Sequence, residues 1–323
     1  MRKKVTATVL LALLVATPLG LLGQGAALAD DVVSTQSPPV LTVHSTGGTI
    51  TLVGSDEAGV RVTSNPNMRP RVNRFDPSQM GDTRIMLPEQ FVRRPYGHGY
   101  RVYRLPARQF TVPMARFGSE GVNVENPGGD LSIAVPRHVG AVFINAEAGN
   151  VEIQKMHAPF IISATTGDVR MVNVGGRGLI RTTTGAVTLG GVGGDLHVQT
   201  ASGAVTVYGS SANSVDVQSD NGPIYFRFAH CGNGVYRFRS KEGTIRLGFR
   251  AGASAQVDAQ SDTGNVQNLF AGTPGASSVV VTQTSAHAVS MAVNGGGPEI
   301  TVTTTSGDIV LEPVAEPSPL KSP

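Results

Sequence analysis

The 323-residue sequence has no tryptophan, a single cysteine and only 15 % charged residues. Because Cys231 has no second cysteine to pair with, an intramolecular disulfide is excluded and stability must come from packing. The lack of tryptophan removes the side chain best suited to stacking on sugars. The 40 glycines disfavour an all-helical bundle, since each glycine inside a helix costs about 1 kcal/mol. Hydrophobic residues make up 40 %, enough for a core.

Residues 1–29 have the pattern of a secretory signal peptide. Basic residues at 2–4 precede an apolar run, and the small residues at 27–29 offer a cleavage site. Pro18 and neighbouring polar residues interrupt the run, which falls short of the ~20 residues that span a membrane. The pattern predicts an exported protein, periplasmic or extracellular and associated with the cell envelope, without a transmembrane anchor in the mature chain.

Removal of residues 1–29 also removes the excess of positive charge. The remainder contains 23 basic and 23 acidic residues, so the mature chain is formally neutral. A neutral chain gives no electrostatic argument for binding nucleic acid, and we expect no nucleic-acid partner.

An 18-residue repeat dominates the rest of the sequence. Gly149, Gly167, Gly185 and Gly203 recur at this interval, and the series extends at wider spacing to Gly48, Gly129, Gly222, Gly243, Gly264 and Gly307. An aliphatic residue stands two positions after each of these glycines: Ile50, Leu131, Val151, Val169, Val187, Val205, Ile224, Ile245, Val266 and Ile309. Alternation with period two on both sides of the glycine predicts two short strands per repeat, each with one buried face.

These repeats predict an all-β protein, a β-solenoid or β-helix-like fold of about eleven short turns. The eleventh turn places His287 where the other turns have glycine. The residue three positions before each glycine is small and in most turns carries a hydroxyl group. We expect these hydroxyls to hydrogen-bond from one turn to the next. The solenoid domain is predicted over residues 30–311, and the proline-rich segment 312–323 is predicted to be a disordered tail.

Several motifs carry a family resemblance. They are the segments Gly48–Gly54 and Gly59–Val62, the Val135–Pro136 step, and the Thr/Ser-x-Gly-x-Val-x-Val turns between Thr165 and Val207. With these motifs the chain resembles the bacterial putative-adhesin family of β-strand-repeat domains of unknown function, over roughly residues 40–64 and 121–311. The resemblance implies an exported β-solenoid at the cell envelope. Its motif is structural and supplies no active site.

A basic insertion at residues 66–120 interrupts the pattern after the first turn. It contains ten arginines and four acidic residues, which gives a net charge of +6. Aromatic and guanidinium groups alternate in it, a combination suited to sugars, phosphates and carboxylates. The candidate contact residues are Arg93, Arg94, Tyr96, Tyr100, Arg101, Tyr103 and Arg104. They predict contact with an anionic envelope polymer or an envelope protein. The competing interpretation is a cap that folds against the acidic solenoid.

A second basic patch is predicted near the C-terminal end of the repeats. Arg237, Arg239 and Lys241 alternate along one strand and therefore share a face. They are candidates for binding a polyanion. The alternative is that they keep an exposed sheet soluble.

No pattern of residues predicts catalysis, a cofactor or a metal ion. The histidines have no metal-ligand spacing, and Gly190–Asp195 resembles only one copy of a calcium-binding repeat. Asp130, Asp168 and Asp308 share the position after the glycine, but other turns lack the carboxylate there. We therefore predict no enzyme activity and no cofactor.

The sequence thus predicts a structural or adhesin-like interaction protein of the bacterial envelope, with the insertion as its contact surface. The alternative is a carbohydrate-active enzyme or lectin acting on acidic polysaccharide. A sensor module that passes envelope signals to a partner is a third possibility. The oligomeric state is left open.

Overall fold

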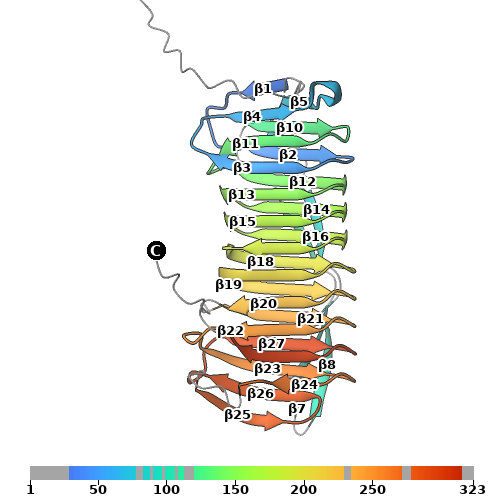
Figure 1. Ribbon diagram of the computed structural model, residues 1–323, viewed down its shortest axis with the longest axis vertical. Helices are drawn as coiled ribbons and strands as arrows, with labels where there is room; N and C mark the ends of the chain where they lie inside the picture. The colour runs from blue at the N-terminus through green and yellow to red at the C-terminus, as the bar shows by residue number, and fades with distance from the viewer. Residues whose placement is uncertain are drawn as a thin grey trace, which may run out of the picture.

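The chain folds into a stack of two-stranded turns, as the repeats predict (Figure 1). The computed structural model describes residues 29–77, 83–87, 90–96, 99–105, 108–112, 120–228, 234–270 and 278–314. Strands of successive turns pair in parallel and form two faces, sheet A and sheet B. The β-solenoid prediction is confirmed. No helix in these described ranges is long and apolar enough to cross a membrane.

One strand of each turn belongs to each sheet. Sheet A contains β1 (Ala29–Val33), β3 (Ile50–Ser55), β4 (Val60–Ser64), β11 (Leu131–Pro136), β13 (Val151–His157), β15 (Val169–Gly175), β17 (Val187–Gly190), β20 (Ile224–Phe228), β22 (Ile245–Phe249), β24 (Val266–Asn268) and β28 (Ile309–Pro313). Sheet B contains β2 (Val40–Ser45), β5 (Arg71–Phe75), β10 (Gly121–Asn126), β12 (Ala141–Ala148), β14 (Phe160–Thr166), β16 (Gly178–Thr184), β18 (Gly193–Thr200), β21 (Tyr236–Ser240), β23 (Ala255–Ser261), β25 (Val279–Thr284), β26 (Ala288–Val293) and β27 (Glu299–Thr304).

The long strand β19 (Val205–Ser219) belongs to both sheets, and its register shifts near Gly209. A 3-10 helix, η1 (Pro66–Met68), follows β4. Two antiparallel pairs form within the basic insertion: β6 (Thr83–Leu87) with β9 (Arg108–Val112), and β7 (Gln90–Tyr96) with β8 (Gly99–Leu105).

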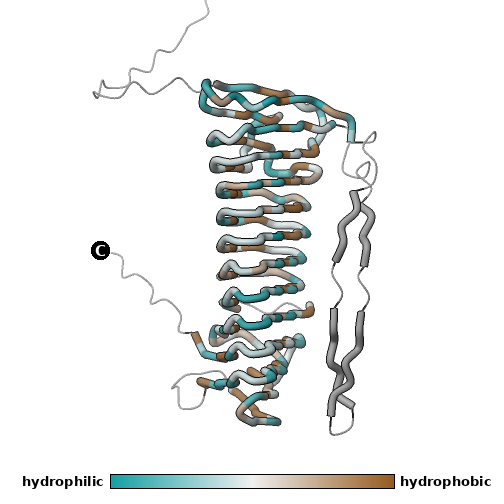
Figure 2. Tube along the Cα trace, turned by 90° about the vertical axis from the view of Figure 1, so that its right-hand side faces the viewer, coloured by the Kyte–Doolittle hydropathy of each residue, from teal (hydrophilic) through white to brown (hydrophobic). Residues whose placement is uncertain are grey.

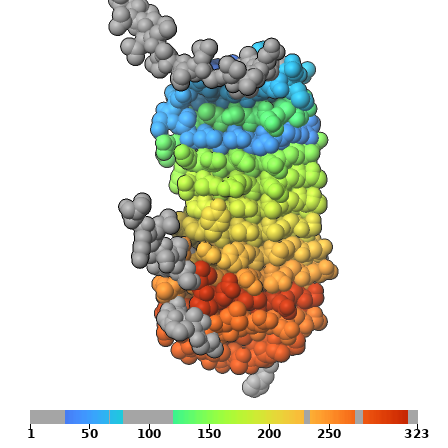
Figure 3. Space-filling model, in the orientation of Figure 1, coloured from blue at the N-terminus to red at the C-terminus, as the bar shows by residue number. Residues whose placement is uncertain are grey.

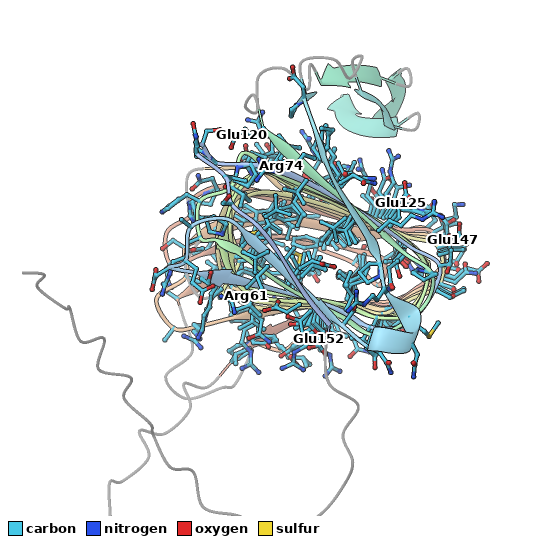
Figure 4. The ribbon with its side chains drawn as sticks, turned by 90° about the horizontal axis from the view of Figure 1, so that it is seen from above. Arg61, Arg74, Glu120, Glu125, Glu147 and Glu152 are labelled. Carbon is cyan, nitrogen blue, oxygen red and sulfur yellow. The ribbon has the colours of Figure 1, made fainter. Side chains whose placement is uncertain are left out.

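The core is a continuous column of stacked aliphatic side chains. Val151, Val169, Val187 and Val205 pair with one another in succession, and each is 0 % exposed. Figure 2 shows hydrophobic residues recurring at corresponding places in successive turns. Seen along the stack, Arg61 and Glu152 point outward from sheet A and Glu125 from sheet B (Figure 4). Inward positions therefore form the core, and outward positions such as Arg61, Glu125 and Glu152 lie on the surface of the rod.

The glycine corners bring the backbones of successive turns close together. Gly149, Gly167 and Gly185 have φ of 101°, 117° and 135°, a region that side chains disfavour. A Cβ on Gly185 would also collide with the carbonyl group of Gly167 in the preceding turn. The glycine is therefore required both by the local bend and by the close stacking of the corners.

Hydroxyl groups beside the corners mainly close their own turn. Thr200 Oγ1 accepts a hydrogen bond of 3.0 Å from the Gly203 N–H, and Ser240 Oγ accepts one of 2.8 Å from Gly243. The expected bonding between turns is found at Ser261, whose Oγ donates to the Gly307 carbonyl at 3.0 Å. The hydroxyls of Thr200, Ser240 and Ser261 thus each secure the bend of their own turn, and Ser261 also links two neighbouring bends.

The stacking order departs from the chain order at both ends of the rod. β2 and β3 lie between the turn β10–β11 and the turn β12–β13. At the other end, β27 and β28 lie between β21–β22 and β23–β24. Figure 3 shows these two displaced turns as bands of colour: β2 and β3 form a blue band among green turns, and β27 and β28 form a red band among orange turns.

Antiparallel strands cover both ends of the parallel stack. β5 pairs with β10, and β4 pairs with β11 and β1. β26 pairs antiparallel with β23 and with β25. The prediction of an eleventh parallel turn at His287 is therefore wrong, because β25 and β26 form an antiparallel hairpin that ends the stack. In the described residues the parallel turns number ten, one for each glycine of the repeat.

The structure describes only the last residue of the predicted signal peptide and the first residues of the predicted C-terminal tail. β28 continues through Glu312 to Pro313, paired with Gly248 and Phe249, so the first residues of the predicted tail belong to the sheet. Residues 315–323 of that tail lie outside the described residues, as do residues 1–28 of the predicted signal peptide.

Replacement of a corner glycine tests the close stacking. We expect Gly185→Ala to lower the free energy of unfolding by about 2 kcal/mol or more, because the added methyl group meets both strain and the Gly167 carbonyl. Gly252→Ala is the matched control: nothing lies within 4 Å of its added Cβ, so its effect should stay within about 0.5 kcal/mol. Urea unfolding followed by circular dichroism measures both. Equal stabilities of the two variants would contradict the packing argument.

Candidate functional site

A groove runs along the outer surface of sheet B. Strand register stacks six outward residues from β12 to β21 in one line: Phe143, Ile161, Leu179, His197, Asp216 and Arg237. We call this line the outer file. It lines a groove of about 470 Å³ whose rim includes Arg177 and Asp195, 3.1 Å apart. The first three residues are apolar and the last three polar, so the groove changes character along its length.

The polar end of the groove is a connected network. Asp216 accepts a hydrogen bond of 2.6 Å from Arg239 Nη2, and its other oxygen lies 3.5 Å from His197 Nδ1. The second ring nitrogen of His197 lies 3.2 Å from Gln199 Nε2, and Gln199 Oε1 accepts from Arg181 Nε at 3.1 Å. Because all five side chains are at least partly buried, each restricts the position of the next.

Burial determines the protonation state of His197 in this network. Desolvation lowers the pKa of His197 below its ordinary value of 6.5, against the opposing attraction of Asp216. The positive charges of Arg239 and Arg181 add to the lowering. Burial also lowers the pKa of the Arg181 guanidinium. The neutral imidazole is therefore the form favoured in the folded protein at neutral pH.

The predicted patch at Arg237, Arg239 and Lys241 is only partly available to a ligand. Arg239 is bonded to Asp216, and Lys241 Nζ lies 2.8 Å from an oxygen of Asp220. Arg237 is exposed at the end of the groove. Neighbouring carboxylates thus compete with any polyanion for two of the three cations.

The candidate residues of the insertion lie on the two strands of a hairpin. β7 contains Arg93, Arg94 and Tyr96, and β8 contains Tyr100, Arg101, Tyr103 and Arg104. Arg94 stands opposite Arg101 in the register. The side chains of this hairpin lie outside the described part of the structure, so their role as a contact surface stays a prediction.

The outer file was not predicted from the sequence, although the repeat contains a signal for it. Each of its six residues stands six positions before the corner glycine of its own turn. The repeat alone therefore defines this outward column. The inward columns of the repeat indicate the fold, whereas the outward columns indicate the surface. An apolar run within an outward column indicates a covered surface.

The aspartates that follow the corner glycines have a structural role. Asp168 Oδ1 accepts a 2.8 Å hydrogen bond from the Ala186 N–H of the next turn, and Asp130 and Asp308 accept equivalent bonds from Thr49 and Asn265. They fasten neighbouring corners and do not converge on one site. The described residues contain no group of three or more side chains that could hold a metal ion. His230 and Cys231 lie outside the described residues.

Comparison with known proteins identifies a domain family and several structures of low similarity. The model of the Toastrack DUF4097 family matches residues 34–312. A putative cell adhesion protein from Clostridium sporogenes is 8 % identical, covering 89 % of this chain and 99 % of its own, with a TM-score of 0.21. Putative adhesins from Parabacteroides distasonis and Parabacteroides merdae are 11 % and 10 % identical, with TM-scores of 0.27 and 0.28. The alignments cover 90 % and 91 % of this chain and 98 % of each adhesin. No curated protein matches the chain.

The His197 network predicts how stability depends on pH. As the pH falls through 6.5, the unfolded chain takes up a proton at this residue before the folded protein does. The free energy of unfolding should therefore decrease from about pH 7 downward until the folded pKa is passed. His197→Gln should show a smaller decrease over this interval. Urea midpoints of both proteins at about pH 7.5 and pH 5.5 measure the difference. An unchanged pH dependence in the variant would contradict the assignment.

Proposed function

Because the chain belongs to the Toastrack DUF4097 family, we propose that it acts as a non-enzymatic interaction protein of the bacterial envelope whose basic insertion contacts an anionic polymer. The rod would be the rigid support, and the Arg/Tyr hairpin β7–β8 the contact surface. The proposal includes export of the chain through the signal peptide expected at residues 1–29.

The distribution of charge is the observation that carries this proposal. On the rod, carboxylates neutralise many of the cations: Arg137 Nε lies 2.7 Å from Asp56, Arg61 Nη2 3.0 Å from Glu57, and Arg239 and Lys241 are paired as described. The insertion has ten arginines and only four acidic residues. Because the mature chain is formally neutral, the rest of it carries −6, and the excess positive charge is concentrated in the insertion. This concentration favours a polyanionic partner.

The insertion is attached to the rod at two adjacent points. β5 ends at Phe75, directly opposite Gly121 at the start of β10. The two ends of the insertion are thus neighbours in one sheet, and the segment between them can be removed without breaking a turn of the stack. Glu120 is also fixed there, since its carboxylate accepts a 2.8 Å hydrogen bond from the Gln36 N–H.

The surface of the rod favours binding over catalysis. A glycosidase or lyase needs a pair of carboxylates or bases that face one substrate bond. The carboxylates at the corners instead bind backbone N–H groups, and Asp216 is held by Arg239. A lectin remains the second candidate, because Tyr96, Tyr100 and Tyr103 can stack on sugar rings.

Binding to defined anionic polymers tests the proposal. Polygalacturonate and inorganic polyphosphate are the probes, with dextran as the neutral polymer. We expect Arg93, Arg94, Arg101 and Arg104 replaced together by Gln to weaken binding about tenfold or more, because four cations are lost from one surface. Binding by the unaltered protein should also weaken between about 0.05 M and 0.5 M salt.

The matched control replaces four arginines of the rod, Arg61, Arg137, Arg170 and Arg246, by Gln. Its net charge changes by the same amount, so retained binding would locate the contact in the insertion. Equal losses in the two variants would contradict the proposal, since they would show an effect of total charge alone. Release of reducing sugar from polygalacturonate, abolished by a single carboxylate substitution, would contradict the non-enzymatic role.

A further inference from the structure

The apolar half of the outer file is unusual for an outward surface. Phe143, Ile161 and Leu179 lie on the adjacent strands β12, β14 and β16, where the pleat points them away from the core. The corresponding outward line on sheet A, through β13, β15 and β17, contains Glu152, Arg170 and Thr188. Three neighbouring large apolar residues on one outward line therefore indicate a docking surface.

The burial of these residues points to a covering element. Leu179 is only 8 % exposed although it faces outward, and Phe143 and Ile161 are half-buried. Phe143 is also engaged in an interaction of its own. A bare outward line on a flat sheet would leave more of these side chains in contact with water.

The insertion begins and ends beside this surface. Phe75, Gly121, Val40 and Ala141 stand in register on β5, β10, β2 and β12, and Ala141 lines the groove. With a strand spacing of ~4.8 Å, the insertion leaves the sheet at Phe75 about 14 Å from the start of the groove and rejoins it at Gly121 about 10 Å from that start. The insertion therefore reaches the groove without crossing another face of the rod.

The ribbon of the insertion is long enough to cover the whole groove, and it needs a surface to pack against. From Thr83 to Tyr96 the ribbon spans at most about 46 Å, whereas the groove from β12 to β21 is about 24 Å long. A two-stranded ribbon is marginally stable by itself and needs a second layer. The alternating apolar residues Ile85, Leu87, Phe110 and Val112 supply the sequence pattern of a ribbon with one face to bury.

We propose that the ribbon formed by β6–β9 and β7–β8 docks lengthwise in the groove of sheet B, seated on Phe143, Ile161 and Leu179. The docked ribbon holds the Arg/Tyr hairpin at a fixed place beside the rod. This inference does not depend on the polyanion proposal, because the ribbon can dock whatever the hairpin binds.

Hydrogen exchange on the full chain tests the docking. In the unaltered protein we expect the backbone amides of residues 83–112 to be protected. Ile161→Lys, which places a charge in the seat, should speed their exchange at least tenfold and leave β13, β15 and β17 unchanged. Thr188→Lys is the matched control on the outer surface of sheet A, and its exchange should equal that of the unaltered protein. Unprotected amides in the unaltered protein, or equal exchange in both variants, would overturn the proposal.

A second measurement does not require the lysine variant to fold. Residues 78–118 are replaced by a short Gly/Ser turn, which is sterically feasible because Phe75 and Gly121 are paired. Removal of the ribbon should uncover the groove and increase the fluorescence of an added apolar dye several-fold, and Ile161→Ser and Leu179→Ser together should abolish the increase. An unchanged dye signal after removal would overturn the docking. Loss of amide protection on dilution would also overturn it, because the occupant would then be a second copy of the chain.

Discussion

The close approach of successive backbones at the glycine corners is the constraint on which the rest of the structure depends. Parallel strands give each turn its hydrogen bonds, but these bonds continue along the whole stack only where the corners also come into contact. Gly167 and Gly185 meet with no room for a Cβ between them. The aliphatic columns can then stack without gaps, and the corner hydroxyls and carboxylates bond to backbone groups that are already in place.

A stack built in this way separates stability from function. Inward residues are set by packing against the turns on either side, whereas outward residues can change without disturbing the core. The two outward lines differ accordingly: the line on sheet A is polar through its middle turns, and the outer file on sheet B changes from apolar to a His–Asp–Arg network. The distinctive chemistry of this protein therefore lies on sheet B and in the insertion that emerges beside it.

The repeat predicted the fold because its pattern of glycines and inward aliphatic residues is strict. It did not predict the direction of strand pairing or the order in which the turns stack. The ten glycine positions and the inward valines were identified, since a buried column tolerates little variation. The His287 segment was misassigned because alternation in Val280, Thr282 and Thr284 fits an antiparallel hairpin as well as a parallel turn. The stacking order at the ends was not foreseen either, since all turns present similar columns and sequence alone does not say which turn is the neighbour. The His197 network required the structure, because the repeat stacks His197 beside Asp216 but does not specify the side-chain conformations that make the bonds to Gln199 and Arg239.

The displaced position of the first and last turns affects how the rod responds to force. In an ordinary solenoid the terminal turn has one neighbour, so a pull on the chain end detaches turns one after another. Here β28 is bonded to β22 on one side and to β24 on the other, and β2 is likewise held between β10 and β12. Detaching either of these turns therefore has to break the hydrogen bonds along both of its edges, so we expect them to resist detachment under tension more than a terminal turn with one neighbour.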